Sequence, residues 1–144
     1  KLLRSYAADL LNAGILERYS LEMKISKDAE TAVIECDARL ISRAINNLVQ
    51  NSINHNPQGC TISLGLIRSD TAIFLTVADN GVGLSAEKLR ELEEKPHYME
   101  STDERLDLRH GLGLLLVRQI VEAHGGTIEM ESTPQNGYKT VLTF

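Results

Sequence analysis

An asparagine-rich stretch, residues 46–56, constrains the fold of this 144-residue chain more than any other feature. Apolar residues recur at three- and four-residue steps from Leu40 to Val49, which is the spacing of an amphipathic helix. Asparagine is a mediocre helix former because its amide competes for backbone hydrogen bonds. Its repetition at helical spacing therefore indicates a polar stripe opposite the apolar face. We expect Asp37 to cap the start of this helix and residues 57–59 (Pro-Gln-Gly) to end it.

Four side chains share the predicted stripe. Asn47 and Asn51 are one helical turn apart, and Asn54 and His55 lie one turn further on. An amide offers a neutral oxygen to a hard cation and hydrogen bonds to a phosphate. The stripe therefore predicts a site for a cation or a phosphate. The simpler alternative is a solvated helix face, which is favoured when the asparagines are taken alone.

Composition and charge exclude several classes of protein. A hydrophobic content of 42% and a charged content of 24% are ordinary for one soluble domain. A net charge of -5 argues against a nucleic-acid partner, and no apolar run approaches the ~20 residues that span a bilayer. The two cysteines form no Cys-x-x-Cys pair, so neither a zinc site nor a disulfide framework is indicated. We expect a cytoplasmic domain of a longer protein, without direct membrane contact.

The order of the predicted elements favours an α+β fold, namely a two-layer α/β sandwich with a mixed sheet. Helical spacing predicts helices before Gly14, in the asparagine stretch and after Gly111. Alternation and turn residues predict strands at residues 19–25, 31–36, 61–67, 71–78, 127–131 and 138–144.

The sequence Asp79-Asn80-Gly81-Val82-Gly83 closes one of the predicted strands. Taken alone, Asn-Gly is most simply a tight hairpin turn. The functional alternative is a pocket for a nucleotide base. In that case the Asp79 carboxylate accepts hydrogen bonds from an adenine amino group, and Gly81 and Gly83 let the backbone pass close to the ligand.

A second glycine motif, His110-Gly111-Leu112-Gly113-Leu114, precedes the last predicted helix. A helix start attracts phosphate through its free N–H groups, although glycines there are also compatible with a plain flexible helix start. The spacing matches neither a dinucleotide fingerprint nor a P-loop. Between the two motifs, residues 84–110 lose clear periodicity, apart from a short helix that Ser85 is expected to cap. We expect this segment to be a mobile lid.

Taken in order, these motifs resemble those of the GHKL ATP-binding superfamily, and within it the catalytic ATP-binding domain of bacterial sensor histidine kinases. The asparagine helix resembles the N box, and the motifs at residues 79–83, 111–114 and 137–140 resemble the three glycine boxes. The resemblance covers nearly the whole chain from Tyr19 on. It implies a Bergerat ATP-binding fold, with a mostly antiparallel sheet packed on helices. We accordingly expect residues 1–15 to be the end of a linker helix from a preceding domain and residues 16–144 to be the catalytic domain.

The same resemblance implies ATP and Mg²⁺ as cofactors. It places Mg²⁺ on the amide oxygen of Asn51, the phosphates beside Asn47 and the adenine amine on Asp79. Further ATP-binding positions carried over from the family are Asn54, His55, Gly81, Gly83, Leu84, His110, Gly111, Leu112, Gly113, Leu114 and Thr140.

The chain departs from the family pattern at several positions. Asn54 stands where a lysine is common, His55 where a tyrosine is common, and Arg109 where the fuller second box begins with glycine. No Phe-x-x-Phe box is present in the lid. Arg105 or Arg109 is expected to supply positive charge to the phosphates, unless both are plain solvated arginines.

The resemblance implies donation of the ATP γ-phosphoryl group to a histidine on a separate dimerisation domain of the same protein, with a response regulator downstream. In the family an acidic residue commonly follows the acceptor histidine, and none of the four histidines here is followed by one. We therefore expect the acceptor to lie outside this chain, the isolated domain to be nearly inactive and the parent protein to be membrane-anchored. The alternatives are another GHKL protein, such as an anti-sigma-factor serine kinase or an ATP-driven clamp, or a non-catalytic nucleotide-binding module.

Overall fold

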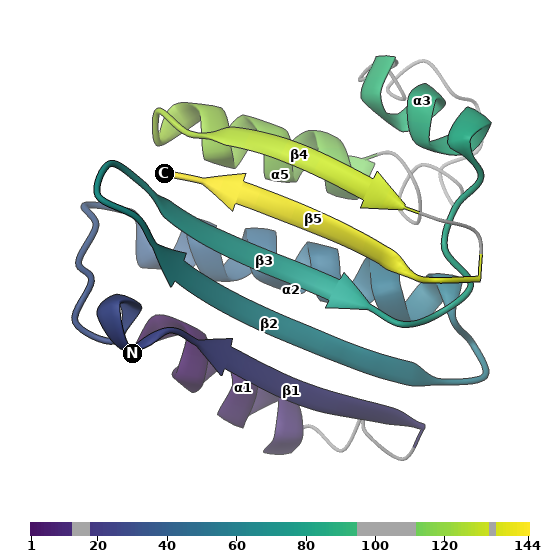
Figure 1. Cartoon of the computed structure of the whole chain (residues 1–144), viewed down its shortest axis with the longest axis horizontal. Helices are drawn as coiled ribbons and strands as arrows, with labels where there is room; N and C mark the ends of the chain where they lie inside the picture. Colours follow the sequence, from purple (N-terminus) through teal and green to yellow (C-terminus); the bar gives the residue numbers. More distant parts are fainter. Residues whose placement is uncertain (13–17, 95–111, 133–134) are drawn as a thin grey trace.

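The structure is a computed structural model that describes residues 1–12, 18–94, 112–132 and 135–144 (Figure 1). Helices and strands follow one another in the mixed order that the sequence pattern predicts. The elements are α1 (Leu2–Asn12), β1 (Tyr19–Ile25), the 3₁₀ helix η1 (Lys27–Ala29), α2 (Ala38–His55), β2 (Cys60–Arg68), β3 (Ile73–Asp79), α3 (Ala86–Glu94), α5 (Leu112–Ala123), β4 (Thr127–Ser132) and β5 (Tyr138–Thr143).

The five strands form one sheet in the order β1-β2-β3-β5-β4. β1 runs parallel to β2, and the other three pairs are antiparallel. Helices α1, α2 and α5 lie together on one face of this sheet (Figure 1). The predicted two-layer α+β sandwich with a mixed, mostly antiparallel sheet is therefore confirmed.

The core lies between α2 and the middle strands. Ile45 and Val49 lie one turn apart on α2 and are fully buried, as are Ile62 and Leu64 on β2. The spacing of four on the helix and of two on the strand places each pair on the face where the two layers meet. At the start of α2, the Asp37 carboxylate accepts hydrogen bonds from the Arg39 and Leu40 N–H groups, so the predicted cap is confirmed.

The predicted strand at residues 31–36 is wrong, because this segment forms no strand. The chain must leave the end of β1, enter α2 and return as β2 beside and parallel to β1. Such a parallel connection crosses over the helical layer, which leaves residues 31–36 no neighbouring strand. The alternation of this segment has another cause: Ala32, Ile34 and Cys36 are half-buried along an apolar cavity, whereas Val33 is 90% exposed at its edge.

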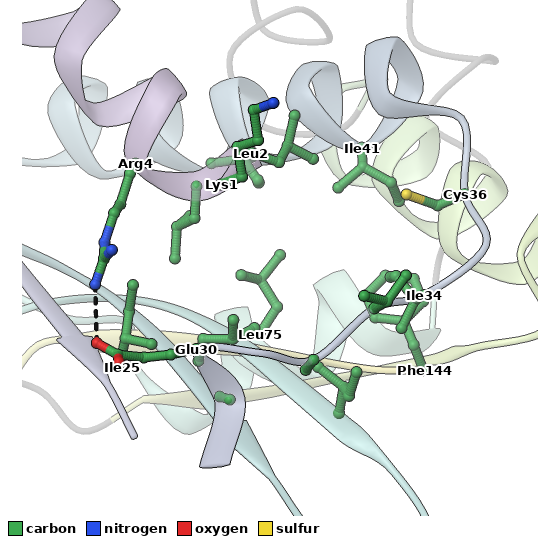
Figure 2. A pocket seen from close by; sticks show the side chains of 17 residues that line it. Lys1, Leu2, Arg4, Ile25, Glu30, Ile34, Cys36, Ile41, Leu75 and Phe144 are labelled. Carbon is green, nitrogen blue, oxygen red and sulfur yellow. Dashed lines mark hydrogen bonds and ion pairs between the residues drawn. The ribbon is translucent and has the colours of Figure 1, made fainter. Parts of the chain in front are cut away.

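This cavity has a volume of about 310 Å³ and lies at the end of the sheet where β3 begins. Figure 2 shows Arg4 and Glu30 paired at its edge, with their nitrogen and oxygen 3.0 Å apart. Phe144 and Ile41 line its interior. The apolar side chains of residues 31–36 thus cover the end of the core instead of joining the sheet.

Helix α1 contributes to the same core as α2. Leu3, Ala7 and Leu10 are buried at helical spacing on its inner face. Tyr6 donates a hydrogen bond to the side-chain oxygen of Asn46 on α2, at 3.0 Å, and burial raises the pKa of its phenol to about 12. The assignment of residues 1–15 to a linker helix from a preceding domain stays a prediction.

His124 links the end of α5 to the start of α2. Its Nε2 accepts a hydrogen bond from the Asp37 N–H at 3.0 Å, so the ring proton is on Nδ1, which donates to the Ile120 carbonyl at 2.7 Å. The sequence indicates a surface or partner-bonded histidine rather than a metal ligand, and the partners are backbone groups. The ring therefore holds the N-terminus of the asparagine helix in place.

Replacing His124 by alanine is expected to lower the free energy of unfolding by about 1–2 kcal/mol, since two hydrogen bonds are lost and the Asp37 N–H loses its partner. Urea denaturation measures this change. The control is Glu122→Ala, an exposed position two residues earlier on α5, which is expected to change stability by less than about 0.5 kcal/mol. Equal effects of the two substitutions would contradict the proposed link.

Candidate functional site

Four of the predicted site residues meet where α2 and β3 both end and β5 begins. His55 is the last residue of α2, and Asp79, the last residue of β3, pairs with Tyr138 on β5. Between these ends lies a cavity of about 10 Å³, which has room for about one water molecule. The residues that line it are His55, Asn56, Asp79, Gly83, Leu84 and Tyr138. Four predicted residues are thus brought together with two that were not predicted.

The asparagine stripe leads along α2 toward this end of the sheet. Asn51 is only 7% exposed, and among the residues that the structure describes its amide has no hydrogen-bond partner. Asn47 is half-buried one turn before it. Asn54 is exposed and does not line the small cavity. Asn51 therefore fits the predicted role of a buried oxygen ligand, whereas Asn54 stands apart from the cavity.

The Asp79 carboxylate is half-buried and oriented by its own loop. Its Oδ1 accepts a hydrogen bond from the Gly81 N–H at 3.0 Å. This bond engages one of the two carboxylate oxygens and fixes the plane of the group. A fixed carboxylate presents its acceptors in a defined direction, which recognition of an amino group requires.

Thr140 lies on β5, two residues after Tyr138, the partner of Asp79, and its hydroxyl is unsatisfied. Thr140 pairs with Val77 on the neighbouring strand β3, and the Thr140 side chain is fully buried. Within the described part of the chain, its Oγ1 has no hydrogen-bond partner. A buried hydroxyl without a partner costs about 1–3 kcal/mol, so the predicted binding position at Thr140 fits a polar ligand group or a bridging water.

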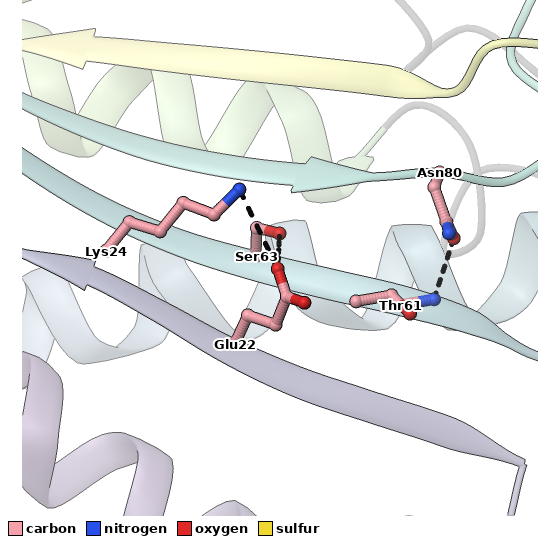
Figure 3. Close-up of polar contacts among 5 residues, drawn as sticks. All are labelled: Glu22, Lys24, Thr61, Ser63 and Asn80. Carbon is pink, nitrogen blue, oxygen red and sulfur yellow. Dashed lines mark hydrogen bonds and ion pairs between the residues drawn. The ribbon is translucent and has the colours of Figure 1, made fainter.

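The loop after Asp79 is held from several neighbouring elements. Asn80 accepts a hydrogen bond from the Thr61 N–H of β2 at 2.8 Å, on the sheet face that Figure 3 shows. Leu84 donates its N–H to the Ser132 hydroxyl of β4 at 2.6 Å. The loop is therefore anchored to β2 and β4, which the motif alone does not predict.

Two glycines of these loops are required by close contacts or backbone geometry. Gly137 has a φ of 91°, and a Cβ there would overlap the backbone carbonyl oxygen of Asp79. Gly83 has a φ of 65°, a left-handed conformation that favours glycine. The turn before β5 therefore lies directly against the end of β3.

The two cysteines pack against the core and carry no disulfide. Burial, and secondly the charge of Asp79, raise the pKa of the Cys60 thiol to about 11. The thiol is therefore protonated at neutral pH and is a poor nucleophile. Both cysteines therefore act as small residues that pack against the core.

Several predicted positions lie outside the described residues: His110, Gly111, Arg105 and Arg109, together with most of the predicted lid. The first part of the lid forms α3, and the Ser85 hydroxyl accepts from the Lys88 N–H at 3.2 Å, so the predicted cap is confirmed. In the second glycine motif, Leu112 opens α5, Gly113 follows in its first turn and Leu114 packs against the core.

The described ranges contain no group of three or more His, Cys, Asp or Glu side chains placed to hold a metal ion. A cation at this site would therefore rely on amide oxygens such as that of Asn51, together with oxygens of water or phosphate. None of the helices in the described part of the chain is long and apolar enough to cross a membrane.

Comparison with known families identifies residues 36–144 as a match to the histidine kinase-, DNA gyrase B-, and HSP90-like ATPases. The chain belongs to this family. The matched residues run from the segment before α2 to the end of the chain, so they include every predicted site residue of this ATPase-family domain.

Curated relatives of this family member carry names of sensor proteins. The chain is 35% identical over 103 residues to the sensor protein IrlS of Burkholderia pseudomallei, covering 72% of this chain and 22% of that protein. It is 31% identical over 131 residues to the heme sensor protein HssS of Staphylococcus saprophyticus, covering 89% of this chain and 28% of that protein. The chain therefore spans about a quarter of the length of these relatives.

Solved structures share the fold of the whole chain. The catalytic domain of histidine kinase ThkA superposes with a TM-score of 0.78 at 22% identity, covering 99% of this chain and 89% of that chain. Full-length ShkA in complex with AMPPNP superposes with a TM-score of 0.76 at 19% identity, covering 99% of this chain and 28% of that one. The fold of this ATPase-family chain is that of histidine kinase catalytic domains.

Proposed function

We propose that the chain is the ATP- and Mg²⁺-binding catalytic domain of a sensor histidine kinase. The observation that carries the proposal is that His55, Asp79, Gly83 and Leu84 line one small cavity, with the Asp79 carboxylate oriented by the Gly81 N–H. Two further groups suit a nucleotide: the unsatisfied buried hydroxyl of Thr140 and the buried amide of Asn51. Membership of the ATPase family and the names of the relatives support it.

Each of these groups has a separate role in the proposal. Asp79 accepts a hydrogen bond from the adenine amino group, and Thr140 completes the base pocket with its hydroxyl. Asn51 holds Mg²⁺ through its amide oxygen, with Asn47 beside the phosphates. When bound, Mg²⁺-ATP supplies the γ-phosphoryl group and the metal charge that neutralises the phosphates. The chain itself contributes binding and orientation.

The proposal also names partners. The phosphoryl acceptor is a histidine on a dimerisation domain of the same protein, and a response regulator then receives the group. The parent protein is membrane-anchored, with this domain on the cytoplasmic side. The names of the sensor-protein relatives support the signalling role.

The test compares this chain alone with the chain joined to its native helical domain. We expect the chain alone to bind ATP with little self-phosphorylation and the joined form to label a histidine on the helical domain. Phosphohistidine is labile in acid and stable in base, unlike a serine phosphoester. An acid-stable label would instead favour a serine kinase of the wider superfamily, and ATP binding without any labelling would favour a non-catalytic module.

A further inference from the structure

Asn56, the residue that caps the C-terminus of α2, is only 4% exposed. Both the nitrogen and the oxygen of its side-chain amide form hydrogen bonds. Its Nδ2 donates to the Ser52 carbonyl at 2.8 Å, which fixes the orientation of the amide. Its Oδ1 then faces the loop after β3 and accepts from the Val82 N–H at 2.9 Å. The backbone carbonyl of Asn56 accepts from the Tyr19 hydroxyl at 2.7 Å. The residue is therefore held rigidly between α2, β1 and the loop.

Gly81 lies directly against this amide. A Cβ placed on Gly81 would overlap the side-chain oxygen, carbon and nitrogen of Asn56. The backbone of Gly81 has no positive φ, so an alanine there meets no backbone strain. The neighbouring Asn56 is therefore sufficient to require glycine at this position, and close approach of Gly81 to a ligand stays a prediction.

The contacts form a short chain that ends at the Asp79 carboxylate. The Asn56 side-chain oxygen accepts from the Val82 N–H. Val82 directly follows Gly81 in the same turn, and the Gly81 N–H donates to the Asp79 Oδ1. Because two successive N–H groups of the turn are fixed by different partners, rotation of this turn would break one bond or both. Asn56 also lines the small cavity beside Asp79.

We propose that Asn56 is a positioning residue for nucleotide-base recognition: through Val82 and Gly81 it sets the direction in which Asp79 presents its carboxylate, and Gly81 is glycine in order to admit its amide. The inference rests on the proposed function, because it assigns Asp79 the adenine amino group. Asn56 itself touches no base in this scheme. Its effect is on the selectivity between adenine and guanine nucleotides.

A double-mutant cycle on the 144-residue chain tests the proposal, with Asn56→Ala, Gly81→Ala and the double variant. Titration calorimetry gives the affinities for ADP and GDP. We expect Asn56→Ala to reduce the preference for ADP over GDP by about tenfold, which corresponds to about 1.4 kcal/mol. We expect Gly81→Ala to lower ADP affinity by about tenfold in the native background. In the Asn56→Ala background its effect should be less than about twofold, because the overlapping amide is gone.

Asn46→Ala is the matched control, because Asn46 lies on the same helix and its amide accepts a hydrogen bond from Tyr6, far from the loop. It should leave the ADP-to-GDP preference unchanged. A purely structural role of Asn56 would lower the two affinities equally, and that result would overturn the proposal. Equal effects of Gly81→Ala in both backgrounds would overturn the pairing with Asn56.

Failure of the proposed function gives a different result. If the native chain binds neither nucleotide, the selectivity role of Asn56 is overturned together with the proposed function. Urea unfolding of the native chain, the two single variants and the double variant then still tests the contact between Gly81 and Asn56 without nucleotide. Destabilisation by Gly81→Ala that disappears in the Asn56→Ala background supports the pairing, and additive effects refute it.

Discussion

Replacement of Asn51 by alanine is expected to reduce phosphoryl transfer by the parent kinase at least roughly 100-fold, as the loss of a group that stabilises developing charge does in other enzymes. Asn51 is 7% exposed on α2, one turn from Asn47, and its amide has no partner within the described residues. The substitution would remove the oxygen that we assign to Mg²⁺. Transfer rates and ATP titrations in Mg²⁺ and in EDTA measure the effect.

The metal dependence separates this role from a general weakening of the fold. ATP affinity should fall in Mg²⁺ and change little in EDTA. Because the Asn51 amide has no hydrogen bond to lose within the described residues, the free energy of unfolding should stay the same or rise. Asn46→Ala, on the exposed side of α2, is the control and should keep Mg²⁺-dependent binding. Unchanged transfer and unchanged Mg²⁺-ATP affinity in Asn51→Ala would show that the assignment is wrong.

The secondary structure was predictable wherever the periodicity of apolar residues is compatible with only one type of element. The spacing of apolar residues along α2 and the alternation along β1 predict both elements, and turn residues predict the hairpin of β2 and β3. The segment at residues 31–36 was not predictable in this way. Alternating burial arises in a strand and also in an extended segment that covers a core, and only the position of the neighbouring strands distinguishes them.

Part of the candidate site was predictable, because several of its residues lie in short motifs. Asp79, His55 and Leu84 come together as expected around one cavity. Their supports were not predictable, since they depend on which backbone N–H groups face which side chains after folding. Asn56 and Ser132 hold the loop through the Val82 and Leu84 N–H groups, and no spacing rule indicates such contacts.

At Gly81 the motif predicts the need for glycine but not the neighbouring group that requires it. The motif predicts that this position must be glycine for close approach. In the structure the Asn56 amide lies against Gly81, and close approach to a ligand stays a prediction. The pattern of a motif therefore predicts where space is needed without identifying what fills it.

Replacement of Asp79 by asparagine is expected to lower the affinity for ADP by about 10- to 100-fold, which corresponds to the roughly 1–3 kcal/mol cost of an unsatisfied buried polar group. The asparagine oxygen can still accept from the Gly81 N–H, so the loop keeps its bond. Its amide nitrogen then replaces the second carboxylate oxygen. A donor there faces the adenine amino group, which is also a donor, whereas it matches the carbonyl oxygen of guanine.

Titration calorimetry with ADP and GDP on the native chain and on Asp79→Asn measures this exchange of preference. The native chain should bind ADP more tightly than GDP, and the variant should lose ADP affinity while its GDP affinity holds or rises. Asp70→Asn is the control, because Asp70 is exposed between β2 and β3 and loses the same charge. If the native chain binds ADP and GDP equally, Asp79 does not read the base. An equal loss of affinity for ADP and GDP in the variant would instead show that Asp79 maintains the structure of the loop.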